Sequence, residues 1–430
     1  MQIDENRPKR ILFATIGSLG DLHPGLALAL ELKRRRHRVT IATTPHYRAL
    51  VEESGISFLP LRPDWDPTDV ELIRQCEDIK RGPEVLYRRM ILPHLRNTFD
   101  DLFSAAAQAD LMISGELVYA APLVVEKLGL PWISAILSPF SFFSAHDPSI
   151  MVNAPWLIRL RKAGPLFYRA GLNLGRLATR HWSNPVRQLR RELGLRYRCD
   201  PVFRDKFSPD LVLALFSPLL APKQLDWPRQ TLQAGFVFYQ GQGDNTGDIE
   251  VLRTFLASGE APVVFTQGST AVHNPGDFYT ASMEAAKRLG RRAVLLGINR
   301  NAGEISSGVL ALRCAPYSRI FPYAAVNVHQ GGSGTTGQAL LAGRPMLIVP
   351  YGWDQPDNGA RVARLGAGLC QPRSTYTSVS AQGALERLLT EPLFAIRAAE
   401  AAAKLQQEDG LARACDAITG ILERASLNPI

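Results

Sequence analysis

The sequence predicts an α/β fold made of two domains, each built around a parallel β-sheet. The chain has 430 residues, which is too long for one ordinary hydrophobic core. Short apolar runs rich in β-branched residues alternate with helical stretches along the chain, a pattern typical of parallel strands connected by helices. The alternation breaks around residues 222–262 and then restarts, so we place the junction between the domains there.

In the first half, six apolar runs are expected to be strands. A glycine turn follows the first run and leads into a helix expected over residues 24–35, which begins at Pro24. The expected strands are residues 11–16, 39–43, 56–61, 111–114, 132–137 and 211–216.

The break in the pattern is polar and rich in turn residues, with Asp226-Trp227-Pro228 and the stretch 240–247 as its clearest parts. The alternation restarts afterwards, and the tail over 393–425 is alanine-rich and helical with a break near Gly410. We therefore expect domains at 1–225 and 261–408, a linker at 226–260 and a separate last helix at 409–430. The expected strands of the second domain are residues 263–266, 293–298, 310–314, 326–329 and 346–349.

Composition places the chain among ordinary soluble globular proteins, because 46% of its residues are hydrophobic and 21% are charged. The five cysteines are scattered and form no C-x-x-C pair, so neither a disulfide framework nor a zinc site is expected. This usage favours the reducing cytoplasm. The polar N-terminus lacks the apolar core of a signal peptide, and no apolar run is long enough to span a membrane.

Positive charge is concentrated in one segment. The chain carries a net charge of +9, and residues 151–198 alone contain 11 Arg or Lys against one acid, Glu192. Basic and apolar side chains interleaved in this way suit peripheral contact with an anionic surface such as the inner membrane. The alternative is an amphipathic pair of helices packed on its own domain with a solvated basic face. Nucleic-acid binding is not expected, because no recognised motif accompanies the charge.

The most informative stretch is 326–355, in which a glycine-rich turn joins two buried strands. Gly331, Gly332 and Gly334 allow backbone N–H groups to approach a ligand closely. A helix begins near Thr335, and its free N–H groups and positive dipole end favour an anion, most simply a diphosphate. His329 can add a donor, and Asp354 with Gln355 can bind hydroxyls. Diphosphate beside hydroxyls indicates a nucleotide-sugar.

Two other interpretations fit the same turn. Residues 332–337 match G-x-G-x-x-G, the dinucleotide fingerprint, so an NAD(P)-dependent oxidoreductase is an alternative. Asp354 has roughly the spacing of the acidic residue of that pattern. However, residues 350–353 separate it from the preceding strand, and the motif comes late in the chain. A purely structural turn is the third possibility.

The pattern H-x-G-G-x-G-T starting at His329, followed by Asp354-Gln355, resembles the GT-B glycosyltransferases, in particular the UDP-glycosyltransferase-like (GT1-type) family. The resemblance implies two Rossmann-like domains facing a cleft and a last helix that returns to the N-terminal, acceptor-binding domain. It is closest to bacterial lipid-directed members such as the rhamnosyltransferases of rhamnolipid synthesis. Residues 16–21, 138–146, 226–228 and 264–269 carry this closer likeness.

The resemblance implies a metal-independent, inverting transfer of a hexose from a UDP- or dTDP-sugar to an acceptor hydroxyl. Backbone groups around Ser333, Gly334 and Thr335 would hold the diphosphate, and the Ala315 backbone would hold the base. Many members have a second His in the phosphate-contacting position, where this chain has Gln330, so His329 and Gln330 are both candidates. Gly268 and Ser269 follow the strand at 263–266 and are expected to face the same site.

The general base is expected in the first glycine turn, at the place where the family has His or Asp. Asp21 stands there, and His23, whose ordinary pKa is about 6.5, is its competitor. Burial would raise the pKa of the Asp21 carboxyl into the range useful for a base. Asp21 is also a natural cap for the helix at Pro24. A non-catalytic partner protein with this fold is the remaining alternative, and the presence of Asp21, His329, Asp354 and Gln355 argues against it.

Asp64-Trp65-Asp66 matches the D-x-D metal signature of another glycosyltransferase fold, but it lies between two prolines and follows no long apolar strand. We therefore expect no metal and no cofactor beyond the nucleotide-sugar. Aromatic residues of the first half would line a pocket for a lipophilic acceptor such as a hydroxy fatty acid, sterol or polyphenol. The candidate acceptor residues are Trp65, Phe140, Phe142, Phe143 and His146.

Overall fold

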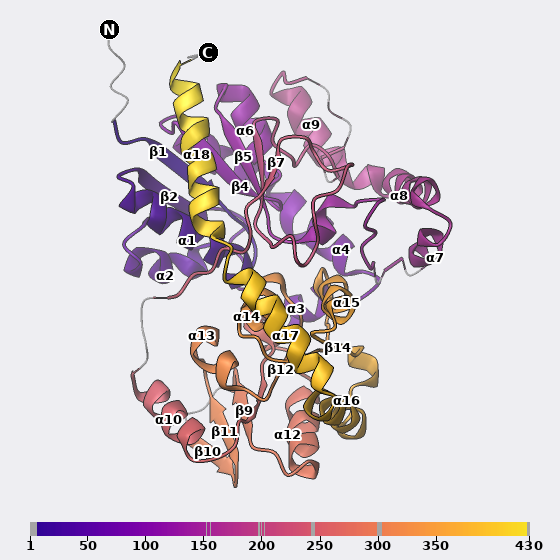
Figure 1. Cartoon of the computed structure of the whole chain (residues 1–430). Helices are drawn as coiled ribbons and strands as arrows, with labels where there is room; N and C mark the ends of the chain where they lie inside the picture. Colours follow the sequence, from indigo (N-terminus) through magenta and orange to yellow (C-terminus); the bar gives the residue numbers. More distant parts are fainter. Residues whose placement is uncertain are drawn as a thin grey trace.

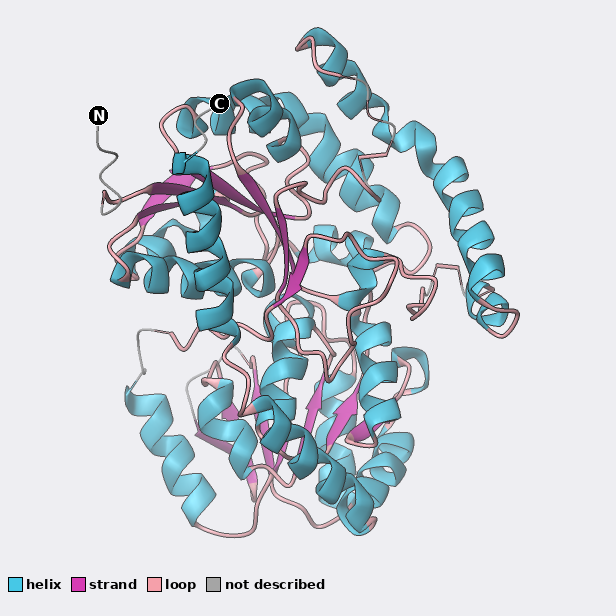
Figure 2. Ribbon diagram, turned by 45° about the horizontal axis from the view of Figure 1, so that its top comes forward, coloured by secondary structure: helices cyan, strands magenta, loops and turns pink. Residues whose placement is uncertain are grey.

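The computed structural model of the chain describes residues 7–151, 153–154, 156–196, 198, 200–201, 203–241, 246–298 and 303–427. It contains two sheets of seven strands, one in each domain, and the domains lie one above the other in Figure 1. Helices cover the strands on both sides (Figure 2). The first residues of the polar N-terminus and part of the polar turn at 240–247 lie outside the described residues.

The sheet of the first domain is parallel throughout. Its order across the sheet starts and ends at short edge strands. In that order the strands are β3 (Ser57–Pro60), β2 (Arg38–Thr43), β1 (Arg10–Ala14), β4 (Leu111–Gly115), β5 (Trp132–Ile136), β6 (Leu211–Ala214) and β7 (Thr231–Gln233).

Side chains of β1 alternate between the two faces of this sheet, as strand geometry requires. Ile11 and Phe13 join the core beneath α1 (Leu19–Arg34), whereas Leu12 and Ala14 join the core beneath α5 (Leu95–Ala106) and α6 (Ala121–Leu128). The remaining helices of this domain include α2 (Arg48–Glu53), α3 (Val70–Cys76), α4 (Gly82–Glu84), α7 (Leu157–Arg161), α8 (Pro165–Thr179) and α9 (Asn184–Glu192).

The sheet of the second domain is parallel except for one antiparallel edge strand, β10, which pairs with β11. Its order is β10 (Gly303–Ser306), β11 (Val309–Leu312), β9 (Ala293–Leu296), β8 (Val263–Phe265), β12 (Val326–His329), β13 (Met346–Ile348) and β14 (Gly368–Cys370). The helices are α10 (Thr246–Ala257), α11 (Gly268–Ala271), α12 (Phe278–Arg288), α13 (Tyr317–Ile320), α14 (Ser333–Leu341), α15 (Gln355–Leu365), α16 (Ser378–Thr390) and α17 (Pro392–Leu405).

The last helix, α18 (Gly410–Leu427), leaves the second domain and packs beside α1 on the first (Figure 1). Its Ala414, Cys415 and Ile418 are fully buried there. Where the chain passes between the domains, Gly410 lies against Gly235, and a Cβ on Gly410 would come within 2.3 Å of the Phe236 carbonyl oxygen. The predicted two-domain architecture and the returning helix are therefore confirmed.

Several boundaries differ from the predicted ones. Strands β1 and β8 end two residues and one residue early, because Ile16 and Thr266 leave the ladder and enter the loops of the site. Strands β7, β10 and β14 were not predicted, since each is only three or four residues long. Strand β7 lies in the expected linker yet pairs with β6, so the first domain extends through it.

Helix α1 begins at Leu19 and not at Pro24, which falls inside the helix. The reason is a capping box at its start. The Ser18 hydroxyl accepts a hydrogen bond from the backbone of the first turn, and the Asp21 carboxylate accepts one from the Ser18 N–H. Among the described helices, none combines the length and apolar character that a membrane span requires.

Candidate functional site

The order of the strands places the site. In each sheet the order reverses at one point, between β1 and β4 in the first domain and between β8 and β12 in the second. Ligands of open α/β sheets bind outside the carboxyl ends of the strands at such a point. Asp21, in the first turn of α1, follows β1, and Glu116 follows β4. Gly268 begins α11 after β8, and His329 is the last residue of β12. The predicted base and donor residues therefore lie at the two switch points.

Asp21 lies in the first turn of α1, where its Oδ2 accepts hydrogen bonds from the Ser18 N–H at 2.7 Å and the Ser18 hydroxyl at 3.2 Å. Gly17 makes room for this carboxylate: it has φ +145°, and a Cβ there would lie 2.2 Å from Oδ2. Burial raises the pKa of Asp21 to about 7. The hydrogen bond from the Ser18 backbone opposes this rise, and the charges of Glu116 and Asp354 add to it. A carboxyl that titrates near neutrality suits a general base.

Glu116 is a residue of the site that the sequence reasoning missed. It follows β4 directly, and its carboxylate accepts from the Ser141 hydroxyl at 2.7 Å and pairs with Lys206 Nζ at 2.8 Å. The Lys206 ammonium also lies 5.3 Å from the centre of the Phe143 ring. Glu116 thus joins the first switch point to the aromatic segment at 139–143. Its position after a buried strand next to β1 was the available signal.

His23, the competing candidate base, packs near Tyr239. Its ring lies 5.2 Å from the ring of Tyr239, and burial lowers its pKa to about 4. The imidazole is therefore neutral across the physiological range and a much weaker base than Asp21.

His329 ends β12 and is fully buried. Its Nδ1 accepts a hydrogen bond from the Gly331 N–H at 3.1 Å. Burial lowers the pKa of His329 to about 3, so the ring is neutral and its proton lies on Nε2. Nε2 has no hydrogen-bond partner among the described residues. The side chain thus has a buried N–H that could donate a hydrogen bond to a polar ligand.

The N-terminus of α14 is open to an anion. The helix begins at Ser333 after Gly332, and no side chain caps it. The backbone N–H groups of its first turn, at Ser333, Gly334 and Thr335, are the groups a helix leaves without intrahelical partners. The Ser333 hydroxyl is also unpartnered within the described part of the chain. Thr335 is buried beside Tyr317, whose hydroxyl lies 3.2 Å from that of Thr266.

Gln330 connects the two glycine turns of the second domain. Its amide packs on Gly268, where φ is +67° and a Cβ would lie 2.1 Å from Gln330 Nε2, so only glycine fits. Gln330 Oε1 has no described partner, and neither has any polar atom of the Gln267 side chain, which is fully buried. Gln267 was missed by the sequence reasoning. Ser269 follows in α11 and is half-buried.

Asp354 and Gln355 lie where α15 begins. Asp354 does not cap this helix, and its Oδ2 accepts from Asn358 Nδ2 at 2.9 Å. Burial raises the pKa of Asp354 to about 6, and side-chain hydrogen bonds from Asn358 and Ser138 oppose this rise. The Oε1 atom of Gln355 accepts from the Tyr351 N–H at 2.7 Å, which leaves its amide nitrogen for a ligand. Trp353, between them and the strand, has φ +60°, a strained backbone typical of functional sites.

Ala315 lies between β11 and α13, as expected for a loop of this edge of the sheet. It is half-buried and packs against the core cluster shared by Tyr317 and Leu312. The backbone at this position is therefore held in place by apolar packing.

The candidate acceptor residues do not form one group. Phe142 is buried between Trp227, with ring centres 4.0 Å apart, and Phe207, at 5.4 Å. It is therefore a core residue and not part of an acceptor pocket. Phe140 and Phe143 are half-buried with ring centres 5.6 Å apart. The remaining two are Trp65, which is half-buried with an unpartnered Nε1 among the described residues, and His146, which is exposed.

The Asp226-Trp227-Pro228 motif holds the aromatic segment in place. Asp226 accepts hydrogen bonds from the Ser144 hydroxyl at 2.7 Å and the Ala145 N–H at 2.8 Å, while Trp227 stacks on Phe142. Ser144 in turn accepts from the backbone of His146. In the Asp64-Trp65-Asp66 sequence, Asp66 Oδ1 accepts from the backbone and hydroxyl of Thr68 and thereby holds a turn.

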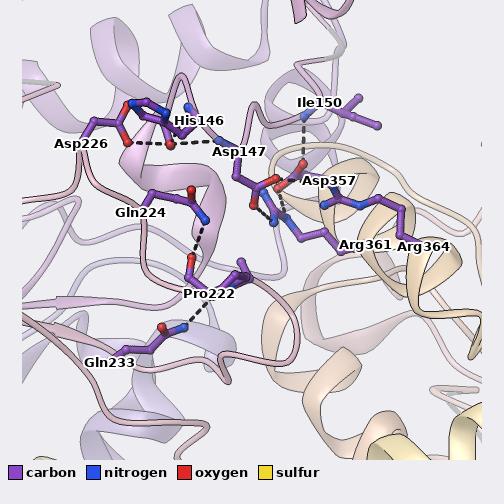
Figure 3. Close-up of polar contacts among 12 residues, drawn as sticks. His146, Asp147, Ile150, Pro222, Gln224, Asp226, Gln233, Asp357, Arg361 and Arg364 are labelled. Atoms are coloured by element: carbon purple, nitrogen blue, oxygen red, sulfur yellow. Dashed lines mark hydrogen bonds and ion pairs between the residues drawn. The ribbon is translucent and has the colours of Figure 1, made fainter. Parts of the chain in front are cut away.

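A buried ionic network joins the two domains beside this segment (Figure 3). The guanidinium of Arg361, on α15, is 1% exposed and pairs with Asp147 of the first domain and, at 2.7 Å, with Asp357 of its own helix. Asp357 also accepts from the Ile150 N–H at 2.9 Å. Burial alone would lower the pKa of Arg361, but the two carboxylates raise it above its ordinary value. None of these residues was predicted, because their pairing depends on how the domains meet.

Two family models match the chain. The model of the glycosyltransferase family 28 N-terminal domain matches residues 11–141, and that of the erythromycin biosynthesis protein CIII-like C-terminal domain matches residues 294–420. The chain is 30% identical over 419 residues to the O-mycaminosyltylonolide 6-deoxyallosyltransferase of Streptomyces fradiae, covering 94% of this chain and 96% of that protein. It is 29% identical to a sterol 3-beta-glucosyltransferase of Neosartorya fischeri, of which it spans 30% of the length.

Solved structures share the fold over the whole chain. The calicheamicin glycosyltransferase CalG4 superposes with a TM-score of 0.71 at 20% identity, covering 97% of this chain and 99% of that one. The spinosyn rhamnosyltransferase SpnG, solved with thymidine diphosphate, superposes with a TM-score of 0.66 at 17% identity, covering 94% and 98%. These neighbours confirm the GT-B arrangement of the two domains.

Gly17→Ala tests whether the position of the Asp21 carboxylate matters. The added Cβ would displace Oδ2, so we expect transfer to fall by about 100-fold or more, as for loss of a general base, while the fold is retained. Gly383→Ala, in α16 with open space around its Cα, is the matched control and should leave transfer unchanged. Circular dichroism and an initial-rate assay measure both. Full activity in Gly17→Ala would show that the carboxylate need not occupy this position.

Proposed function

Because the chain belongs to the GT1-type UDP-glycosyltransferase family, we propose that it transfers a hexose from a dTDP- or UDP-sugar to a hydroxyl of a lipophilic small molecule, with inversion and without a metal. The observation that carries the proposal is the pair of glycine turns at the two switch points. The half-buried Asp21 lies at that of the first sheet, and the uncapped N-terminus of α14 lies at that of the second, beside His329, whose Nε2 has no partner among the described residues.

Asp21 is the general base of the proposed reaction. The acceptor hydroxyl loses its proton to the Asp21 carboxylate as its oxygen attacks the anomeric carbon of the donor sugar. The bond from that carbon to the diphosphate breaks at the same time, on the opposite face. One base and one displacement invert the configuration, and no covalent nucleophile is needed.

The second domain stabilises the leaving diphosphate. The first-turn N–H groups of α14 and the Nε2–H of His329 are donors of the kind that bind a diphosphate and offset the charge that develops on it. A neutral His329 donates a hydrogen bond without adding a full charge. Gln330 holds Gly268 against this turn and contributes its own amide.

Asp354 and the Gln355 amide nitrogen bind sugar hydroxyls, and the backbone at Ala315 binds the base of the nucleotide. The relatives' names supply two kinds of acceptor, O-mycaminosyltylonolide and a sterol. Both are large lipophilic alcohols, which suits the half-buried aromatic rings of Phe140 and Phe143 beside Ser141 and Glu116. We therefore place the acceptor against this segment.

Asp21→Asn should nearly abolish transfer, by about 100-fold to 10,000-fold, because the amide keeps an acceptor for the Ser18 N–H but cannot take a proton. In the unaltered enzyme, kcat/KM should rise as the pH passes through about 7, where the carboxyl ionises. The residual rate of the variant should lack this dependence. Near-normal turnover in Asp21→Asn would rule out Asp21 as the base.

Stability gives an independent control for the same variant. The folded pKa of Asp21 is above the ordinary value of 3.8, so the folded state binds the extra proton and its stability falls as the pH rises from about 4 to about 7. Asp21→Asn removes the ionisable group and with it this loss of stability. It should therefore unfold at a higher temperature than the unaltered protein near pH 8, and a lower one would indicate damage to the cap.

A thermal-shift panel with dTDP, UDP, ADP and NAD tests the donor. A ligand that binds only the folded state at 100 times its Kd adds about 2.7 kcal/mol, which raises Tm by a few degrees. We expect a shift with dTDP or UDP and none with NAD. Gly334→Val, whose side chain meets open space in the protein but would fill the anion site, should lose the shift. Gly383→Val should keep it. A shift with NAD alone would contradict the proposal.

Transfer should continue at its full rate in excess EDTA, since the helix end and His329 supply the stabilisation that a metal gives in other enzymes. Asp66→Asn should also transfer normally, because the contacts of this exposed carboxylate are with Thr68 and, at 3.6 Å, with His46. Loss of activity in EDTA that added Mg²⁺ restores would contradict metal independence.

A further inference from the structure

Helices α7 and α8 lie at the outer edge of the first domain (Figure 1). They carry several large apolar side chains that are exposed. On α8, Leu166 is 78% exposed, Leu174 is 61% exposed and Leu177 is 65% exposed, and Phe167 is 60% exposed beside them. Trp156 and Ile158, next to and on α7, are exposed as well. Exposed apolar groups that gather in one place mark an interaction surface, whereas single ones do not.

The exposed row is not the face by which α8 packs on the protein. At about 100° of rotation per residue, Leu166, Phe167, Leu174 and Leu177 fall within roughly one quarter to one third of the helix circumference. Tyr168 and Leu172 point to the opposite side and are buried. The helix therefore has two apolar faces. One packs on the protein, and the described residues leave the other exposed.

Cationic side chains border the exposed row. Arg169 and Arg176 lie between the two apolar faces of α8, where Arg169 pairs with Asp226 at 3.6 Å and the Arg176 guanidinium lies 5.1 Å from the centre of the Phe203 ring. Arg161 and Lys162, at the end of α7, are exposed, and no acidic residue occurs from 151 to 191. At the end of the helix, a shallow hollow of about 420 Å³ is lined by Leu177, Arg180, His181, Asn184 and Arg187. Apolar side chains bordered by cations suit the boundary between acyl chains and anionic headgroups.

We propose that α7 and α8 dock this protein on the surface of an anionic phospholipid bilayer. Leu166, Phe167, Leu174 and Leu177 enter the headgroup boundary, and the exposed Arg161 and Lys162 bind the phosphates. A second copy of the chain fits this surface poorly, because a symmetric contact would bring the same positive charges together. The docking does not depend on the reaction proposed above.

The same helices support the segment beside the site. The Tyr168 hydroxyl donates to the Ser149 carbonyl at 3.1 Å, and Leu157, Tyr168 and Leu172 form one small core with Ala145, against which Phe143 packs. A bilayer bound to the outer face of α8 would thus lie on the side of the acceptor segment. A lipophilic acceptor dissolved in the bilayer would have a short route to it.

Co-sedimentation of the full chain with lipid vesicles tests the docking. We expect binding to vesicles of phosphatidylcholine mixed with phosphatidylglycerol, weak binding to phosphatidylcholine alone, and a loss of binding as salt screens the cationic side chains. Leu166→Ser with Phe167→Ser should reduce the partition coefficient by at least about tenfold, since two large apolar side chains are removed. Arg161→Glu with Lys162→Glu should reduce it on the mixed vesicles.

Val379→Ser with Leu393→Ser is the matched control, because both side chains are similarly exposed but lie on the second domain. It should bind vesicles as the unaltered chain does. All variants change exposed residues, and their unfolding temperatures should match that of the parent. Equal binding by the Leu166/Phe167 variant, or no binding to anionic vesicles by the unaltered chain, would overturn the proposal. The proposal would also be overturned if the unaltered chain bound no vesicles but formed a dimer in light scattering that this variant abolished.

Discussion

Arg361 carries the contact on which the arrangement of the two domains depends. Its guanidinium is buried and lies between Asp147 from the first domain and Asp357 from the second. Removing one partner of a buried ion pair costs about 3–5 kcal/mol, because the remaining charge is left without compensation. The Ile150 N–H completes the set of donors on Asp357. Since Arg361 stands on α15, which begins at Gln355 directly after Asp354, the same contact relates the proposed sugar-binding pair to the first domain.

The position of the site follows from the direction of the strands. Parallel strands put all their carboxyl ends at one edge, and both domains turn that edge toward the other, so the loops after β1, β4, β8 and β12 meet. Within each domain, small residues make room for neighbouring polar groups. Gly17 admits the Asp21 carboxylate, and Gly268 admits the Gln330 amide. A side chain at either position would separate groups that act together.

Burial determines the protonation states in the site. It raises the pKa of the Asp21 and Asp354 carboxyls and lowers that of His329. Groups that carry no charge can be buried at moderate cost, provided that their polar atoms find partners. Several of those atoms, including His329 Nε2 and Gln330 Oε1, find none among the described residues. The site is thus prepared for a polar ligand, and its folded state is less stable at neutral pH than an uncharged site would be.

The sequence by itself determined the class of fold, the two domains and the location of the glycine turns, because hydrophobic periodicity and turn chemistry are local properties. The return of the last helix was implied only by the resemblance to the GT-B family. Asp21 was singled out by the resemblance to the GT-B family, and His329 and Asp354 by their places at the end of one strand and beyond the end of the next. Only the tertiary structure decided that Phe142 belongs to the core, that Gln355 has one amide atom left for a ligand, and that Glu116, Asp147, Asp357 and Arg361 belong to the site and its domain interface. These are matters of burial and of contact between residues far apart in the chain, and no local pattern records which distant side chain will fill a given space or carry the opposite charge.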